Sequence, residues 1–237
     1  MKAALCLSGY FDSLTDGTSK GFDGYNHIKK HILDKIDTDV FIHNWQPEIK
    51  RDIVNLYKPK NFLIENQIDF SNIVKERQLD TIPEPPRSPS TILSHFYSVQ
   101  KSFSLMEETG LKYDVVIKAR FDLGRINRNT SGPGLGNPYA VQCINFDPTL
   151  DMNKFYVANW DYFYDGPADM WFYSGYDNMI KFTKLYDSLV NQYFFLDSDY
   201  AKSTDINNIS NAVKLYKRFF IDQGIWDILQ PLETTWE

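Results

Sequence analysis

Short apolar runs alternate with helical patterns through the first 123 residues, and this alternation constrains the fold more than any other feature. The runs, in order, are AALCLSG, TDVFIHNW, KNFLIENQ and YDVVIKARFDL. The clearest helical pattern repeats apolar residues at steps of four and three from Ile92 to Met106 and ends at Gly110. Strands that alternate with helices predict a parallel sheet with right-handed crossovers. We therefore expect an α/β fold with a Rossmann-like, mostly parallel central sheet flanked by helices.

Two stretches interrupt this alternation. Residues 66–90 are polar and rich in proline, and residues 124–138 are rich in glycine, so both predict surface loops. The further elements expected from residue spacing are short strands in AVQCINF and KFYVANW and helices within 176–195 and 205–224. We expect the C-terminal half to add a small antiparallel part to the sheet, and residues 1–237 to form a single domain.

Charge, cysteine content and missing motifs disfavour several functional classes. A formal net charge of -6 gives no broad positive field, so we expect no nucleic-acid partner. Cys6 and Cys143 belong to no paired motif, which argues against a disulfide framework or a thiolate metal site. The N-terminal apolar run is too short for a signal peptide or a transmembrane segment, and the expected location is therefore cytoplasmic. The chain also lacks the glycine-rich motifs of P-loop kinases and dinucleotide oxidoreductases and the G-x-S-x-G motif of serine hydrolases.

Polar residues end the predicted strands, and the ends of parallel strands share one edge of a sheet. These residues are Ser8, Gly9 and Tyr10 after the first run, His43 after the second, and Arg120 and Asp122 after the fourth. Gly9 would let a ligand approach the backbone, Asp122 would bind a divalent cation through oxygen, and Arg120 offers a planar fork for a diphosphate. The alternatives are an ion pair that only organises a loop for Arg120 and Asp122, and a hydrogen-bonded histidine near the surface for His43.

A second group of candidate residues lies in the segment DYFYDGPADMW. One of its carboxylates, Asp161, Asp165 or Asp169, would act as general base on an acceptor hydroxyl or bind sugar hydroxyls beside aromatic side chains. The alternative is a Gly-Pro turn between two strands with solvated acids. His27 and His31 are four residues apart on a predicted helix, but no glutamate completes an HExxH motif, so we expect a solvated helix face.

Five pieces of the chain, in this order, resemble a known family. They are LCLSGYFDSL, TDVFIHNW, YSVQKSF, YDVVIKARFDL and DMWFYSGYDNMIKFTKLYDSL. Together they resemble small glycosyltransferase-like proteins of bacterial polysaccharide-biosynthesis clusters and of large viruses and phages. The resemblance spans most of residues 3–190. It implies a GT-A-like fold with a nucleotide-binding half in residues 1–123 and an acceptor-side half in residues 124–237.

The resemblance also implies a donor site and a metal. Asp122 stands where the last acid of the family's Asp-x-Asp motif binds Mn²⁺ or Mg²⁺ and the pyrophosphate of the donor, whereas Arg120 replaces the first acid. One carboxylate binds a metal more weakly than two, and an arginine offsets diphosphate charge by itself. The other residues that the resemblance places at the nucleotide are Ser8, Gly9, Tyr10, Tyr97 and Lys101.

We therefore expect a glycosyltransferase that moves a sugar from a nucleoside-diphosphate sugar to a glycan or other hydroxyl acceptor. Asp122 would orient the metal or the donor sugar, and Arg120 would neutralise the charge of the leaving phosphate. Asp165 or Asp169 would act on the acceptor, and the loop 124–138 would close over the donor. Two alternatives are a catalytically silent nucleotide-sugar or glycan-binding module on the same fold and a nucleotidyltransferase, against which the lack of a glycine-rich loop after the first strand argues.

Overall fold

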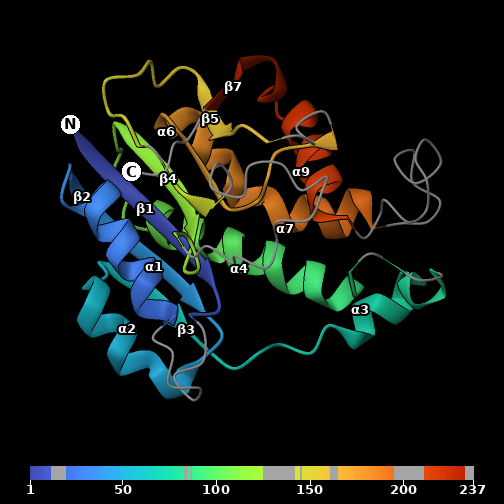
Figure 1. Cartoon of the computed structure of the whole chain (residues 1–237). Coiled ribbons are helices and arrows are strands. Elements are labelled where there is room, and N and C mark those ends of the chain that lie inside the picture. Colours follow the sequence, from blue (N-terminus) through green and yellow to red (C-terminus); the bar gives the residue numbers. More distant parts are fainter. Residues whose placement is uncertain are drawn as a thin grey trace.

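The described part of the chain forms one seven-stranded sheet with helices on both faces (Figure 1). This computed structural model describes residues 1–11, 20–82, 85, 87–124, 142–144, 146–160, 165–194 and 211–232. The expected α/β class with a mostly parallel central sheet is therefore confirmed. Residues 125–138 of the predicted loop 124–138 lie outside the described residues, and so do Asp161 and residues 140, 141 and 145 of the expected strand AVQCINF.

The strands follow the order β3-β2-β1-β4-β6-β5-β7 across the sheet. In chain order they are β1 (Lys2–Gly9), β2 (Asp37–Asn44), β3 (Asn61–Ile64), β4 (Val115–Arg120), β5 (Phe155–Ala158), β6 (Trp171–Ser174) and β7 (Leu229–Leu232). The first four strands are parallel, whereas β6 is antiparallel to both β4 and β5, which is the expected antiparallel addition. The chain builds outward from β1 to β3 and then returns to place β4 on the other side of β1. The point between β1 and β4 is therefore the switch point of the sheet.

Helices cover both faces of the sheet. They are α1 (Lys20–Ile28), α2 (Lys50–Tyr57), α3 (Ser71–Glu76), α4 (Pro89–Glu107), α6 (Tyr176–Met179), α7 (Leu185–Ser188) and α9 (Ala212–Asp222). Shorter 3-10 or π-helical turns are η2 (Lys29–Leu33), η3 (Pro47–Ile49), η4 (Leu79–Thr81), η7 (Ile180–Lys184), η8 (Leu189–Tyr193) and η10 (Trp226–Ile228). In Figure 1, α1 and α2 lie on one face, and α4, α7 and α9 lie on the other. The long helix α4 packs directly on β1 and β2.

The alternation of side chains along each strand sorts the core into one cluster on each face. On β1, Ala4 and Cys6 pack on the α4 side, whereas Leu5 and Leu7 pack on the α1 and α2 side. The α4 side changes from apolar to polar at the carboxyl ends of the parallel strands. The polar residues there are Ser8 on β1, His43 on β2, and Lys118 and Arg120 on β4. The sheet thus presents a group of polar side chains to α4 at the carboxyl ends of its parallel strands.

Several local expectations fail. The proline-rich stretch 66–90 contains α3, and the described residues 142–144 and 146 of AVQCINF are not in a strand. His27 does not lie on a solvated face: it is 9% exposed, and its Nε2 accepts a hydrogen bond from the Ile144 N–H at 3.1 Å. Burial lowers the pKa of His27 to about 3, so the ring is neutral and can accept this bond. His27 is buried because the turn after β4 returns over α1. The turn passes so close that a Cβ on Gly124 would clash with the His27 ring.

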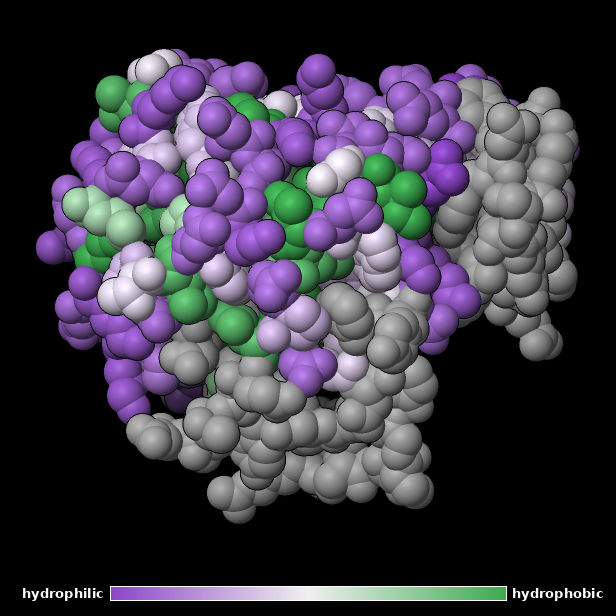
Figure 2. Space-filling model, turned by 90° about the horizontal axis from the view of Figure 1, so that it is seen from above, coloured by the Kyte–Doolittle hydropathy of each residue, from purple (hydrophilic) through white to green (hydrophobic). Residues whose placement is uncertain are grey.

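The outer surface above β5, β7 and α6 is mainly hydrophilic. Figure 2 shows this face with hydrophobic residues in small groups between hydrophilic ones. Small groups of this kind are ordinary on the surface of a globular protein.

Candidate functional site

A cavity of about 780 Å³ opens at the carboxyl ends of β1 and β4. Its lining comes from the end of β1, the end of β4, one side of α4, the turn before β6 and the start of α9. The lining residues are Ser8, Gly9, Tyr10, Trp45, Arg87, Thr91, Ile92, Ser94, His95, Arg120, Asp122, Asp169, Asn211, Ala212 and Val213. A cavity at the switch point of an open α/β sheet is where ligands of such folds bind.

Gly9 forms the rim of the cavity at the end of β1. Its φ of +102° lies in the region that favours glycine, whereas a Cβ there would meet no described atom within 4 Å. Its N–H donates to Ser98 Oγ at 2.9 Å, and its carbonyl accepts from Asn44 Nδ2 at 2.7 Å. The glycine is thus required by the backbone conformation and leaves open space for a ligand beside it.

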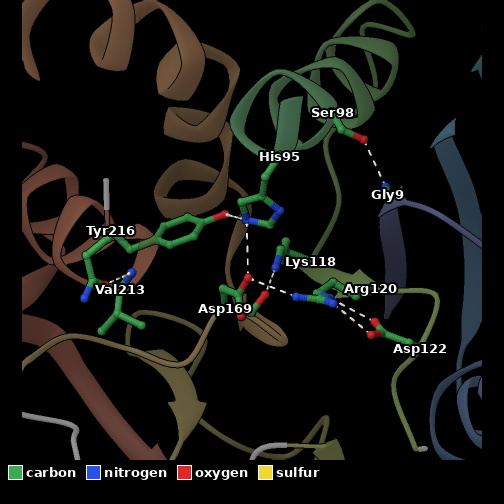
Figure 3. A network of polar contacts seen from close by, with 10 residues as sticks. Gly9, His95, Ser98, Lys118, Arg120, Asp122, Asp169, Val213 and Tyr216 are labelled. Atoms are coloured by element: carbon green, nitrogen blue, oxygen red, sulfur yellow. Dashed lines mark hydrogen bonds and ion pairs between the residues drawn. The ribbon is translucent and has the colours of Figure 1, made fainter. Parts of the chain in front are cut away.

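Arg120 joins two carboxylates at the end of β4 (Figure 3). Its Nε and one terminal nitrogen donate to the two oxygens of Asp122 at 2.9 and 2.8 Å, and the other terminal nitrogen donates to Asp169 Oδ2 at 3.1 Å. Burial alone would lower the pKa of Arg120, but the charges of Asp169 and Asp122 raise it. Burial alone would raise the pKa of Asp169, but Arg120, with His95 and Lys118, holds it well below the usual range. Arg120 and Asp169 are therefore ionised at neutral pH.

Lys118 lies beneath this network, two residues before Arg120 on the same face of β4. Its side chain is fully buried, and its ammonium group donates to the backbone carbonyl of Asp169. The nitrogen also lies 5.1 Å from the Phe172 ring centroid and 5.8 Å from that of Tyr216. Burial lowers the pKa of Lys118 to about 7. Lys118 therefore fixes the turn that carries Asp169 and is close to losing its own charge.

His95 brings α4 into the same network. Its Nε2 lies 3.0 Å from Tyr216 Oη and 3.5 Å from Asp169 Oδ2. The imidazole lines the cavity, and its side chain is 18% exposed. Burial lowers the pKa of His95 to about 3, more than the nearby Asp169 charge raises it, so the ring is neutral at physiological pH.

The structure brings six of the predicted site residues to this cavity. They are Ser8, Gly9, Tyr10, Arg120, Asp122 and Asp169. Asp165 is not in the lining: its side chain is 55% exposed and lies 3.5 Å from Lys214 Nζ. Arg120 and Asp122 form the ion pair that was the structural alternative, and the same pair also lines the cavity.

The other three predicted residues, His43, Tyr97 and Lys101, lie behind the cavity wall. His43 is fully buried, with Nδ1 2.8 Å from Ser98 Oγ and Nε2 3.0 Å from Glu65 Oε1. Tyr97 donates to the same Glu65 oxygen, and Lys101 Nζ lies 5.2 Å from the Tyr97 ring centroid. Because Ser98 also holds the Gly9 N–H, these residues support the rim of the cavity from behind.

The arrangement does not fit a divalent cation at Asp122 as the described residues stand. Both carboxylate oxygens of Asp122 accept hydrogen bonds from the Arg120 guanidinium, which is itself a cation. In the described ranges, no group of three or more histidine, cysteine or acidic residues is arranged to hold a metal.

Sequence reasoning selected Tyr97 and Lys101 from α4 and missed the face of this helix that lines the cavity. Four polar residues of this helix, Thr91, Ser94, His95 and Ser98, have the i, i+3, i+4, i+7 spacing of a single helix face. Three of them line the cavity, and the fourth bonds to Gly9. The sequence did contain a signal for this face, namely a polar stripe on a helix whose neighbouring residues are apolar. Arg87 and Asn211 carried no comparable signal, because each lies in a loop.

The fold and site together define an α/β protein with a polar cavity at the switch point of its sheet. Neither a comparison with protein-family models nor a search of curated proteins finds a match to this chain. No helix among the described residues is long and apolar enough to cross a membrane. The geometry of the cavity therefore carries the functional argument.

Proposed function

We propose that this protein transfers a sugar from a nucleoside-diphosphate sugar to a hydroxyl group of a glycan or other acceptor. The observation that carries the proposal is the cavity between β1 and β4, lined by two carboxylates that share one arginine. Carboxylates and a guanidinium fork bind hydroxyl-rich and phosphorylated ligands through several charge-assisted hydrogen bonds. A location in the cytosol is part of this proposal.

Arg120 and Arg87 are the cations available for the diphosphate. Three of the five N–H groups of Arg120 donate to the two aspartates, which leaves one on each terminal nitrogen for a ligand. Arg87 lines the cavity and lies two residues before the start of α4. Together they would offset the negative charge that develops on the leaving diphosphate.

Asp169 is the carboxylate best placed to act on the acceptor. In the transfer, the acceptor oxygen bonds to the anomeric carbon of the sugar while the bond from that carbon to the diphosphate oxygen breaks. Asp169 lines the cavity and is held ionised by Arg120, so it accepts a hydrogen bond from the acceptor hydroxyl and, in an inverting reaction, its proton. Asp122, fixed by the guanidinium fork, would orient the donor sugar.

A binding module that lacks catalysis is the second candidate. The low pKa of Asp169 favours it, since a strongly stabilised carboxylate is a weak general base. The two candidates differ in one readout. A module binds the nucleotide sugar without releasing nucleoside diphosphate, whereas a transferase releases it.

The proposal is tested with a panel of UDP- and GDP-sugars, with and without Mn²⁺, by calorimetry and by assay of released nucleoside diphosphate. Asp122→Asn keeps the shape of the side chain but removes the charge that Arg120 pairs with, so donor turnover is expected to fall by about tenfold or more. Asp177→Asn is the matched control, because Asp177 is 91% exposed and lies on α6, outside the cavity. Unchanged turnover in Asp122→Asn contradicts the assigned role, and no donor binding at all contradicts the proposed function.

A further inference from the structure

The two ring nitrogens of His95 have different surroundings. Nε2 lies beside Tyr216 Oη and Asp169 Oδ2, as the dashed lines in Figure 3 show. The same view shows the second nitrogen, Nδ1, on the opposite side of the ring, toward Gly9. Within the described ranges, Nδ1 has no hydrogen-bond partner. Because both His95 and Gly9 line the cavity, Nδ1 is available to a ligand there.

The neighbours of Nε2 decide which nitrogen carries the proton. The Tyr216 hydroxyl, 3.0 Å from Nε2, can donate or accept and therefore fits either tautomer. The Asp169 carboxylate is an acceptor only, so at 3.5 Å it is attracted to an Nε2–H and repelled by a bare Nε2 lone pair, which favours the proton on Nε2. The ring is neutral, because burial lowers its pKa to about 3, and it therefore carries only one proton. With that proton on Nε2, Nδ1 is a hydrogen-bond acceptor fixed in position by α4.

Ser8 provides a second polar group without a hydrogen-bond partner in the same cavity, within the described part of the chain. Its side chain is 2% exposed, and its hydroxyl has no hydrogen-bond partner among the described residues. A buried hydroxyl left without a partner destabilises the fold, so such groups commonly meet a ligand or an ordered water. Ser8 and His95 both lie on the α4 side of the sheet, where the cavity begins.

We infer that His95 is a specificity-determining residue whose Nδ1 accepts a hydrogen bond from one hydroxyl group of the bound sugar. The inference rests on the proposed function and adds to it the way in which one donor sugar is distinguished from another. A sugar that lacks this hydroxyl, or presents it in the other configuration, leaves the Nδ1 acceptor unpaired and binds more weakly. Tyr216 and Asp169 act as positioning residues, because they hold the ring in one orientation and one tautomer.

Two substitutions distinguish the role of Nδ1 from that of Nε2. The His95→Asn variant keeps a polar atom near the position of Nδ1. The His95→Gln variant keeps one near the position of Nε2 and leaves the Nδ1 position empty. With the tightest-binding UDP- or GDP-sugar of the panel, His95→Asn is expected to stay within about threefold of the wild-type affinity. His95→Gln is expected to lose about tenfold, the effect of one hydrogen bond.

Monodeoxy analogues of the same donor identify the hydroxyl. One analogue is expected to bind wild type about tenfold more weakly than the parent sugar, and to lose nothing further in His95→Gln, because the two changes remove the same contact. Equal affinities of wild type, His95→Asn and His95→Gln for the parent sugar overturn the inference while the proposed function stands. No binding of any nucleotide sugar to wild type overturns the proposed function and this inference with it.

Nitrogen-15 NMR of the wild-type protein tests the tautomer even where a variant fails to fold. The expected spectrum shows His95 neutral between pH 5 and pH 8, with the proton on Nε2 and a bare Nδ1. A proton on Nδ1, or an imidazolium at neutral pH, overturns the inference without touching the proposed function. Addition of the bound nucleotide sugar is expected to shift the Nδ1 signal as it accepts the new hydrogen bond.

Discussion

Arg120 shows how one residue serves both the fold and the site. Its guanidinium binds Asp122 through two nitrogens and Asp169 through the third, so it links the end of β4 to the turn before β6. A half-buried arginine between two acids stabilises the fold only while both acids are ionised. The structural and functional interpretations of this pair are thus compatible, because the ion pair that ties the two strands together also lines the cavity.

Lys118 gives the clearest pH dependence at the residue scale. Burial lowers its pKa to about 7 from an ordinary value of 10.5, against the charges of Asp169 and Asp122. Between these two pH values the unfolded chain binds a proton that the folded chain does not, so folding becomes more favourable as pH rises. The stability of wild type relative to Lys118→Met is therefore expected to increase from pH 7 toward pH 10, by up to about 1.4 kcal/mol per pH unit.

Urea unfolding at several pH values measures this difference. Lys112→Met is the control, since the side chain of Lys112 is 79% exposed and its ammonium group is hydrated in both states. The difference between wild type and Lys112→Met is expected to be flat over the same range. A flat difference for Lys118→Met as well would show that the buried ammonium group keeps an ordinary affinity for its proton.

The sequence identifies only some of the residues that line the site. Gly9, Arg120 and Asp122 follow directly from strand ends, because the end of a parallel strand is a defined place in the fold. Asp165 and Asp169 could not be distinguished from the sequence, since both lie in one short irregular turn, where the direction of each side chain does not follow from residue spacing. The turn directs Asp169 to Arg120 and Asp165 to Lys214.

At the scale of elements, α4 is the support of the cavity rim. Ser98, on its polar stripe, accepts the Gly9 N–H and lies 2.8 Å from His43 Nδ1, so it joins α4 to the ends of β1 and β2. Glu65 holds the other nitrogen of His43 and, as an acceptor, requires the proton there. Neutral His43 therefore accepts from the Ser98 hydroxyl, whose oxygen is then available to Gly9.

Ser98→Ala removes a partner from two groups at once. Loss of the hydroxyl leaves the Gly9 N–H and the buried His43 Nδ1 unpaired, so a destabilisation of about 1–3 kcal/mol is expected, with weaker donor binding. Ser102→Ala is the matched control, because Ser102 is equally buried on the same helix but bonds only to the Val99 carbonyl of its own helix. Denaturant unfolding that gives equal losses for the two variants would mean that Ser98 does not support the rim.

At the scale of the whole molecule, the regular half of the fold was predictable and the irregular half was not. The apolar runs of β1, β2 and β4 are largely buried on both faces, and their composition marks them as central parallel strands. The strands β6 and β7 have four residues each and no separate pattern, since β6 continues an aromatic segment and β7 contains Pro231. Their places are set by pairing with distant strands, which residue spacing alone does not encode.

The same reasoning explains why the cavity could be located but not fully described. Its floor consists of strand ends, which the order of elements predicts. Its walls come from α4 and from the start of α9, where Asn211 caps the helix by accepting from the Val213 N–H at 3.0 Å. The approach of α9 to α4 depends on Tyr216, which stacks on Phe96 with ring centroids 4.8 Å apart. Long-range packing of this kind has no local sequence signal.

The most direct test of the central claim is a crystal structure of the protein with the tightest-binding nucleotide sugar of the panel. The predicted result is a donor lying between Gly9 and Asp122 at the carboxyl ends of β1 and β4, with its sugar hydroxyls on Asp122 and His95. A donor bound only elsewhere on the protein, with the cavity between β1 and β4 free of ligand and Asp122 free of the donor sugar, would contradict the account.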